Sequence, residues 1–490
     1  MEADLIVIGG GAAGYRAAVT AAHLGARAVL VERDTLGGTC LNQGCIPKQS
    51  LLHLASLIED VAALNGRGLA GEVKGDFPAA LAHKDSVVRG IRDNLGQWLA
   101  RLGVNVLRGE ARLAARGRVC VRGSNGEEEF VRRIARGKLR RMQVPTLIEG
   151  VPQGMPDVVV MQLPSPVDGR VVMTSREFML KLDRLPAAVL CVGGGAIGTE
   201  LGYLLAQFGA RVTIAEQAGR LLDSPRIPET AADLLERKLE RIGVDVRKGV
   251  TVAQCEVGDA RARVRLTDGF EAEFDLVLVA VGRAPVTSGL DLAAAGVALT
   301  DGGFVRVNEY LEASAPGVYA IGDARPGPMT ANAALHDAKL AVSNALGLER
   351  LRTNYFRVPV VIHSALEIAA VGLTEEQAEE AGFDTEVARA RLAAGGKARA
   401  QHEREGFVEV VHDSHTGQLL GGCIVGPEAG EQIHLLAAAC QSERGLWFLK
   451  DLHYSHPSWC EELEAAIDPF AARLARSGRT LFRPGILAKV

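Results

Sequence analysis

The chain has 490 residues, of which 48% are hydrophobic, 23% are charged and 4% are aromatic, and its formal net charge is −4. This length exceeds one ordinary hydrophobic core and suggests about three domains. The small net charge and the scarcity of aromatic side chains argue against nucleic acid as the main partner. We see no secretory leader and no apolar run long enough to span a bilayer, so we expect a cytoplasmic protein with no membrane partner.

The first segment of the chain carries a nucleotide-binding pattern. A strand is expected over Leu5–Ile8, followed by a glycine motif, a helix, and a second strand that ends in Glu32. The motif has the form G-x-G-x-x-G and its glycines are Gly9, Gly11 and Gly14. Such glycines let a pyrophosphate approach the helix N-terminus, and the acid can accept hydrogen bonds from a ribose. The segment therefore predicts a βαβ unit that binds a dinucleotide.

Two cysteines follow this unit directly. Of the eight cysteines in the chain, only Cys40 and Cys45 lie close together, and an apolar helix-like stretch follows over residues 50–64. The N-terminal end of a helix lowers the pKa of a thiol. A disulfide across four intervening residues closes a small loop and is suited to opening and closing. With no second pair or nearby histidine to complete a zinc site, we predict a redox pair and no metal.

The dinucleotide pattern recurs in the middle of the chain. A strand over 188–192 leads into a second glycine motif, and a strand over 211–215 ends in Glu216. A carboxylate there suits the free ribose hydroxyl of NAD and repels the 2′-phosphate of NADP, although the nearby Arg220 keeps NADP open. Two such units imply two dinucleotides. FAD with a nicotinamide nucleotide is the economical pairing, because a flavin exchanges electrons with both a hydride donor and a thiolate.

The cysteine segment resembles the signature of the pyridine nucleotide–disulfide oxidoreductases, and the chain is closest to their dihydrolipoamide dehydrogenases. The resemblance covers nearly the whole chain, including the stretches 275–285 and 317–323 and the part from about Asn354 onward. It implies an α/β fold with two Rossmann-like domains, for FAD and NAD, and a C-terminal α+β dimerisation domain. The expected bounds are 1–150 and 277–350 for the FAD domain, 151–276 for the NAD domain and 351–490 for the dimerisation domain.

The resemblance also implies roles for individual residues. His456 is a proton carrier near neutral pH, and Glu461, five residues later, would orient it. In the family this base is supplied by the other subunit of a homodimer. Cys40 would exchange with the substrate and Cys45 would face the flavin. The expected FAD contacts are Gly9, Gly11, Gly14, Glu32, Arg33, Gly38, Thr39, Gln49, Ala111, Asp323, Met329 and Ala331. The expected NAD contacts are Gly193, Gly195, Ile197, Gly198, Glu200, Glu216 and Gly282.

The expected activity is the transfer of electrons between a dihydrolipoamide-like dithiol, free or on a lipoyl-protein, and NAD through the cysteine pair and FAD. The chain has no redox cysteines at its end, which separates it from mercuric reductase, and Glu216 argues against the NADPH-linked glutathione type. Two alternatives stay open. One is an NADH-dependent reductase of another disulfide, a quinone, a metal or oxygen. The other is a catalytically weakened relative that mainly binds a partner.

Four positions depart from the family pattern. The family has a lysine four residues after the second cysteine, which lies beside the flavin and pairs with a glutamate matching Glu200. In this chain that position is Gln49, and Lys48 stands one place earlier. The family's Ala-Thr-Gly stretch is matched to 134–138, which contains Arg136 and is followed by about a dozen extra residues. The other two departures are Leu366 in place of a proline and Tyr454 in place of a histidine. The lost positive charge at Gln49 should disfavour an anionic reduced flavin.

Overall fold

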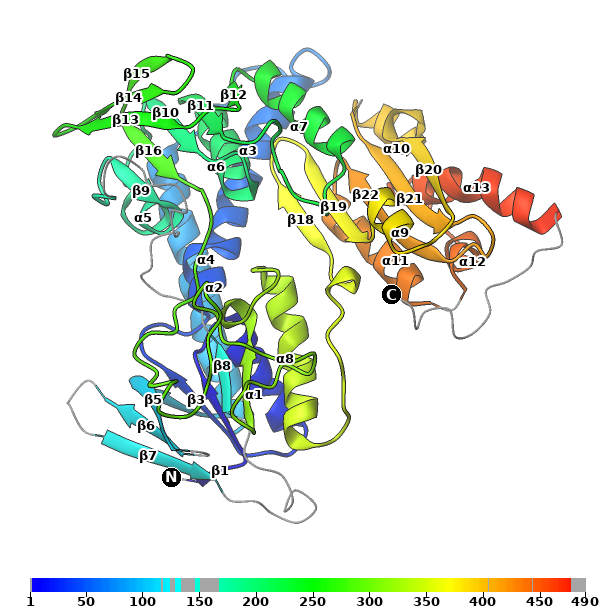
Figure 1. Ribbon diagram of the computed structural model, residues 1–490. Coiled ribbons are helices and arrows are strands. Elements are labelled where there is room, and N and C mark those ends of the chain that lie inside the picture. The colour runs from blue at the N-terminus through cyan, green and yellow to red at the C-terminus, as the bar shows by residue number, and fades with distance from the viewer. Residues whose placement is uncertain are drawn as a thin grey trace. The chain divides into compact units, whose positions relative to one another are not determined.

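The computed structural model describes residues 2–115, 118–123, 128–133, 146–149, 167–403, 405–442 and 444–476 (Figure 1). The chain divides into two compact units. The first unit comprises Met1–Leu54, Lys74–Leu185 and Val281–Tyr355. The second unit comprises Ala55–Val73, Pro186–Ala280 and Phe356–Val490. Within the described ranges, no helix is both long enough and apolar enough to cross a membrane.

The first unit is built on a parallel sheet with the strand order β17-β8-β2-β3-β4. Its strands are β2 (Leu5–Ile8), β3 (Ala28–Glu32), β4 (Asn105–Arg108), β8 (Thr146–Glu149) and β17 (Val318–Ile321). Every residue of β2 and β3 is buried, as expected for strands covered on both faces. A second sheet, β1-β7-β6-β5, is formed by Glu2–Ala3, Glu128–Arg133, Arg118–Arg122 and Glu110–Ala115.

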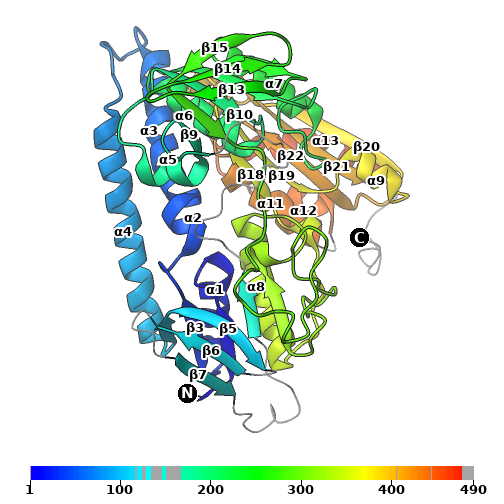
Figure 2. The ribbon, with the colours of Figure 1, turned by 60° about the vertical axis from the view of Figure 1, so that its left-hand side comes forward.

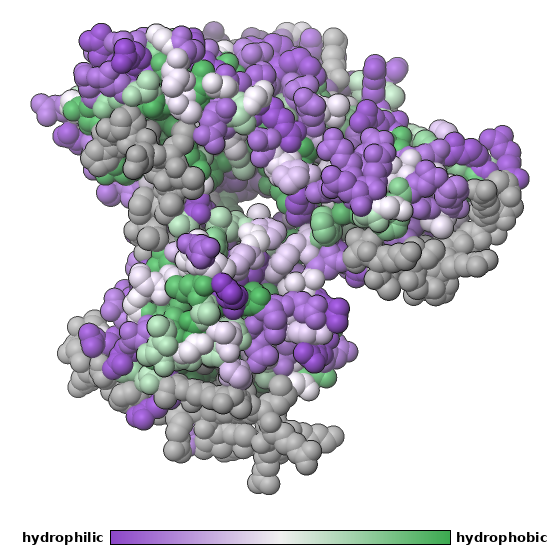
Figure 3. All heavy atoms as spheres, viewed as in Figure 1, coloured by the Kyte–Doolittle hydropathy of each residue, from purple (hydrophilic) through white to green (hydrophobic). Residues whose placement is uncertain are grey.

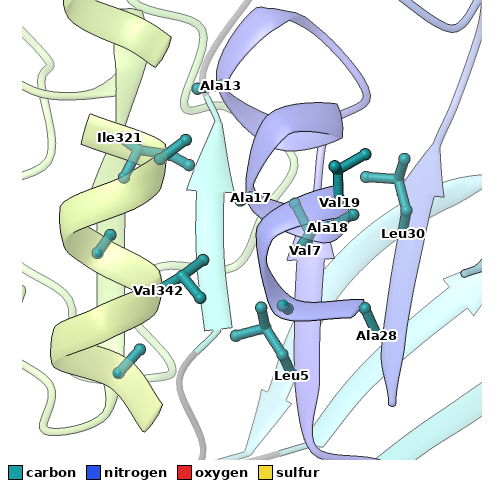
Figure 4. Close-up of a cluster of buried hydrophobic side chains, with 14 of the residues drawn as sticks. Leu5, Val7, Ala13, Ala17, Ala18, Val19, Ala28, Leu30, Ile321 and Val342 are labelled. Atoms are coloured by element: carbon teal, nitrogen blue, oxygen red, sulfur yellow. The ribbon is translucent and has the colours of Figure 1, made fainter. Parts of the chain in front are cut away.

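Helices α1 (Ala12–His23) and α8 (Ala331–Leu346) pack side by side in the first unit (Figure 2). Small side chains on α1, such as Ala13 and Ala17, let the helix approach its neighbours closely (Figure 4). The remaining helices are α2 (Gly38–Gln43), α3 (Cys45–Leu64), α4 (Phe77–Arg101) and α5 (Ser175–Lys181). Of these, α3 begins in the first unit and ends in the second.

Strand β8 is a feature that the sequence did not predict. It lies between β2 and β17 and pairs with both in parallel. The stretch 134–138, matched above to the family's Ala-Thr-Gly sequence, lies outside the described residues. The place between β2 and β17 is filled by Thr146–Glu149, which comes later in the chain than that stretch.

The second unit contains a second parallel arrangement, in which β10 (Ala188–Val192) pairs with β11 (Arg211–Glu216) and β16 (Leu276–Val279). Strand β12 (Asp245–Lys248) extends it beside β11. Helix α6 (Ala196–Gln207) connects β10 to β11, and α7 (Glu229–Arg241) follows β11. The buried residues of α7 recur at helical spacing, and Figure 3 shows mainly hydrophilic residues where α7 faces the viewer. A small antiparallel sheet consists of β13 (Val252–Val257), β14 (Ala262–Leu266) and β15 (Glu271–Phe274).

The C-terminal part of the second unit is an antiparallel sheet with the order β18-β19-β22-β21-β20. Its strands are Val360–His363, Glu367–Gly372, Leu419–Val425, Phe407–Asp413 and Thr385–Arg391. Helix α11 (Ala429–Gln441) packs on β19 and β22, and α13 (Glu461–Arg476) packs on β20 and β21. Shorter helices are α9 (Glu375–Glu380), α10 (Gly396–Ala400) and α12 (Leu446–Lys450). The predicted α/β class with an α+β C-terminal part is confirmed, while the residue bounds expected for the three domains stay a prediction.

Candidate functional site

The loop after β2 is shaped by a hydrogen-bonded carboxylate. The chain turns at Gly9, whose φ is 100°. The Gly10 N–H donates to Glu32 Oε2 at 2.7 Å, and the Asp34 N–H donates to Glu32 Oε1 at 2.8 Å. Helix α1 starts after Gly11 without a capping side chain. A phosphate can take the place that such a side chain would fill, so the loop fits the pyrophosphate of a dinucleotide.

The loop after β10 repeats this geometry in the second unit. The Gly194 N–H donates to Glu216 Oε2 at 2.6 Å, and the Ala218 N–H donates to Glu216 Oε1 at 2.7 Å. A Cβ on Gly198 would collide with the carbonyl oxygen of Gly193, so the loop and the helix start need glycine to come this close. The chain thus contains two copies of one arrangement. In each copy, a glutamate accepts a hydrogen bond from the backbone N–H of a glycine 22 residues before it.

Arg220 does not serve as a phosphate ligand in this loop. Its Nε donates to the Asp223 carboxylate at 3.1 Å, its Nη1 to the Ile227 carbonyl at 3.2 Å and its Nη2 to the Ser224 carbonyl at 3.0 Å. All three guanidinium nitrogens are therefore engaged within the loop itself. Arg220 therefore gives no reason to expect NADP, and the carboxylate of Glu216 suits the free ribose hydroxyl of NAD.

Replacing Glu216 with glutamine should raise the KM for NAD about 10-fold and narrow the preference for NAD over NADP. The amide has one acceptor oxygen for two backbone N–H groups, and it has no charge to repel a 2′-phosphate. Steady-state kcat/KM values for both nucleotides measure the effect. Glu229→Gln, at the exposed start of α7, is the matched control. An unchanged KM for NAD in Glu216→Gln would contradict the assignment.

The cysteine pair lies where two helices meet. Cys40 is half-buried within α2, and Cys45 is exposed as the first residue of α3. The sequence placed the start of the helix near residue 50, but α3 begins five residues earlier, because Pro47 falls in the first turn, where no backbone N–H needs an intrahelical partner. The helix dipole favours a thiolate at Cys45.

The two residues matched to the family's lysine–glutamate pair have different surroundings. Gln49 is exposed in the second turn of α3, and Glu200 is only 2% exposed in α6. The backbone N–H of His363 donates to Glu200 Oε1 at 2.9 Å, and the Ser364 hydroxyl donates to the Thr199 carbonyl at 2.8 Å. The end of β18 thus fixes the first turns of α6 in the second unit.

His456 and Glu461 form a pair at the start of α13. The Nδ1 of His456 donates to Glu461 Oε2 at 2.8 Å, and the Ser458 N–H donates to the other carboxylate oxygen. These two hydrogen bonds hold the pKa of Glu461 below its ordinary value. The His456 side chain is 79% exposed. Glu461 therefore fixes the imidazole through Nδ1, and Nε2 is the nitrogen that can exchange a proton with another group.

Asp323 provides a test of whether the first unit fits a flavin nucleotide. It lies in a 3-10 turn, Gly322–Ala324, directly after β17 and is 8% exposed. Among the described residues its carboxylate accepts no hydrogen bond, and the nearest cation is Arg283, with Nη1 at 3.7 Å. Burial raises the pKa of Asp323. A buried carboxylate without donors fits a ligand that brings hydroxyl groups, as the ribityl chain of FAD does.

The predicted residues are distributed over both units. Every expected FAD contact and both cysteines belong to the first unit, and His456 and Glu461 belong to the second. The expected NAD contacts belong to the second unit except Gly282, which belongs to the first. The buried pair formed by Arg325 and Asp337 beside Asp323 was not predicted from the sequence. Nothing in the local sequence marks this arginine as buried, because arginine is nearly always exposed.

Comparisons with known proteins agree with this geometry. The family model of the pyridine nucleotide-disulphide oxidoreductases matches residues 3–338, and the model of their dimerisation domain matches residues 358–467. The chain is 36% identical to a dihydrolipoyl dehydrogenase of Thermus scotoductus, over 95% of this chain and 96% of that protein. It is 32% identical to a dihydrolipoyl dehydrogenase of Bacillus subtilis, over 94% of this chain and 97% of that protein.

Two solved structures share the fold over nearly their whole length. LpdA from Mycobacterium tuberculosis has a TM-score of 0.84 and 25% identity, over 95% of this chain and 99% of that one. The HOCl-induced flavoprotein disulfide reductase RclA from Escherichia coli has a TM-score of 0.79 and 28% identity, also over 95% of this chain and 99% of that one. The chain belongs to the pyridine nucleotide-disulphide oxidoreductase family and is an enzyme that uses FAD and NAD.

Proposed function

We propose that this enzyme oxidises a dihydrolipoamide-like dithiol and reduces NAD, with Cys40 and Cys45 as its redox pair. The observation that carries the proposal is the exposed His456 held by Glu461 at 2.8 Å. A dithiol must lose protons to attack a disulfide, whereas a quinone or metal acceptor requires no such base. The relatives from Thermus scotoductus and Bacillus subtilis, both dihydrolipoyl dehydrogenases, support the choice of substrate.

The proposed chemistry begins with the oxidised cysteine pair. A thiolate of the substrate attacks Cys40 Sγ, so that a mixed disulfide forms and Cys45 leaves as a thiolate. The second substrate thiol, once deprotonated, attacks the substrate sulfur of the mixed disulfide, closes the cyclic disulfide product and releases Cys40. The two electrons of the substrate now reside in the reduced cysteine pair. FAD, when bound, supplies the two-electron carrier between this pair and NAD.

The His456–Glu461 pair can accept the proton that the substrate thiol loses. His456 Nε2 takes the proton of the attacking thiol, and the Glu461 carboxylate stabilises the charged imidazole that results. The match of residues 358–467 to the dimerisation domain supports a homodimer, in which His456 of one subunit acts at the cysteine pair of the other. The exposure of His456 in the single chain agrees with this arrangement.

We extend the proposal to a lipoyl group, free or attached to a partner protein, and to the cytoplasm, whose reducing thiol pool suits an enzyme that works through a cysteine pair. Steady-state assays with dihydrolipoamide and NAD test the substrate. Rapid NADH formation is expected, with little activity on oxidised glutathione and NADPH. NADH oxidation by quinones without any turnover of dihydrolipoamide would overturn the proposal and favour the reductase of another acceptor.

Gln49 bears on whether catalysis is weakened in this chain. Replacing Gln49 with lysine should raise the two-electron reduction potential of the bound flavin by roughly 30 mV, about 1.4 kcal/mol, because a cation favours an anionic reduced ring. Spectroelectrochemistry against a reference dye measures the shift. The control is Leu57→Lys, which adds the same charge at an exposed position two turns further along α3. Equal potentials in the two variants would show that position 49 does not influence the flavin.

A further inference from the structure

The turn that carries Asp323 is tied to α8 by a buried carboxylate. The Gly322 N–H donates to Asp337 Oδ2 at 3.0 Å. Arg325 Nε donates to the same oxygen at 2.7 Å, and Arg325 Nη2 also lies 2.7 Å from it. The exposed fractions of the Arg325 and Asp337 side chains are 1% and 0%. The residues before and after Asp323 are thus held by one oxygen atom.

Tyr355 completes this network from the end of the first unit. Its hydroxyl donates to Asp337 Oδ1 at 2.8 Å, so both oxygens of Asp337 are engaged. The guanidinium carbon of Arg325 lies 4.3 Å from the centre of the Tyr355 ring, and Arg325 Nη1 donates to the Pro326 carbonyl at 2.7 Å. Arg325 is therefore fixed by a carboxylate, a carbonyl and an aromatic face.

The two buried aspartates of this region differ in one respect. Asp337 accepts hydrogen bonds at both oxygens from residues of the chain, whereas Asp323 accepts none among the described residues. Replacing a buried ion pair by apolar side chains often costs no stability, so stability alone is a weak explanation for Arg325 and Asp337. An ion pair does restrict orientation, and here it restricts the turn that presents Asp323.

The charges around Asp323 come from three elements. Burial raises the pKa of Asp323, while Arg283 in the loop after β16 and Arg325 in the turn lower it. Asp337 on α8 raises it. Removing Arg325 should therefore move the protonation of Asp323 to higher pH, and removing the charge of Asp337 should move it to lower pH. These opposite signs separate an electrostatic role from a merely structural one.

We propose that Arg325 and Asp337 are positioning residues for FAD, which hold the Gly322–Ala324 turn so that the ionised carboxylate of Asp323 stays open to the hydroxyl groups of the ribityl chain. The inference rests on the proposed function, which needs bound FAD, and on the expected contact of Asp323 with that FAD. Neither Arg325 nor Asp337 contacts the reacting atoms. Both act through Asp323.

Binding of FAD to the apoprotein tests this proposal without any assay of turnover. Bound FAD is removed from the full-length protein, and FAD is titrated back by fluorescence between pH 5 and 9. Arg325→Gln and Asp337→Asn should each weaken FAD binding on the order of 10-fold at pH 7.5. The decline of affinity toward low pH should begin at higher pH in Arg325→Gln and at lower pH in Asp337→Asn than in the unmodified protein.

Two further variants keep the test decisive if Arg325→Gln does not fold. Arg325→Lys keeps the charge, so it should weaken FAD binding without moving the pH profile. Tyr355→Phe removes only the hydroxyl that donates to Asp337 and should weaken binding by a smaller factor. The matched control is Arg352→Gln, an exposed arginine of the same unit that lies beside Glu309 and Tyr310. It should bind FAD like the unmodified protein.

The outcomes distinguish the role of Asp323 as a ligand of FAD from the roles of Arg325 and Asp337 as positioning residues. If Asp323→Ala binds FAD normally, Asp323 is no ribityl ligand and its expected contact with FAD is wrong, while the proposed dithiol oxidation is untouched. If Asp323→Ala weakens binding while Arg325→Gln and Asp337→Asn behave like Arg352→Gln, the positioning role is overturned and the role of Asp323 stands. Equal weakening in both variants with an unmoved pH profile would also overturn the proposal, because it would indicate loss of structure alone.

Discussion

Replacing Cys40 with serine is expected to lower turnover of dihydrolipoamide by roughly 10³-fold or more, because a hydroxyl cannot form the mixed disulfide with substrate. The flavin content should not change. Reduction of the flavin by NADH should also persist, since it does not require Cys40. Stopped-flow absorbance of the flavin, recorded with dihydrolipoamide and then with NADH as the reductant, measures both reactions. Only the reaction with dihydrolipoamide should be lost.

The control for this experiment is Cys255→Ser, which makes the same atomic change at a buried cysteine of β13. It should leave turnover of dihydrolipoamide unchanged. Substantial dihydrolipoamide oxidation by Cys40→Ser would contradict disulfide exchange. It would support the alternative in which the flavin passes electrons to an acceptor that needs no cysteine.

Replacing His456 with glutamine is expected to lower kcat for dihydrolipoamide by about 10²- to 10⁴-fold, the usual contribution of a general base. The amide can still donate a hydrogen bond to Glu461, but it cannot take a proton. Reduction of the flavin by NADH should be unaffected. Because the loss concerns a proton, it should shrink as the pH rises toward the pKa of the substrate thiols, where the thiolate forms without help.

The carboxylate partner gives a graded version of the same test. Glu461→Gln should lower kcat by roughly 10-fold or more, since an uncharged amide stabilises the protonated imidazole less well. The hydrogen bonds from His456 and Ser458 hold the pKa of Glu461 below its ordinary value, so its carboxylate stays ionised and this loss should be constant from pH 6 to pH 9. Glu464→Gln is the matched control, because Glu464 lies in the same helix but pairs with Lys450 and not with a histidine. Equal kcat in Glu461→Gln and Glu464→Gln would contradict the proposed support of His456.

The parts of the site that could be predicted from sequence are those encoded by nearby residues. A glycine motif followed by an acid specifies a βαβ unit, and the structure shows Glu32 and Glu216 bonded to the glycine loops in the same way. The pairing of His456 with Glu461 needs only five residues of spacing. These contacts depend on short stretches of chain, so their pattern is visible without a structure.

The features that sequence did not reveal depend on contacts between distant segments. Glu200 is bonded to the backbone of His363, 163 residues away. Strand β8 pairs with β2, near the start of the chain, and with β17, more than 150 residues after β8. Arg220 could be excluded as a phosphate ligand only when its three partners were seen. No periodicity or motif in the sequence predicts such contacts, because they depend on tertiary packing.

The most direct test of the central claim is an anaerobic titration of the FAD-loaded protein with dihydrolipoamide, followed by the visible spectrum of the flavin. We expect dihydrolipoamide to produce a long-wavelength absorbance band, which arises when the thiolate of Cys45 is released against oxidised flavin. In Cys40→Ser, where Cys45 has no disulfide to be released from, dihydrolipoamide should leave the spectrum unchanged. A flavin that NADH bleaches but that dihydrolipoamide leaves unchanged would contradict the claim that this enzyme oxidises a dithiol through Cys40 and Cys45.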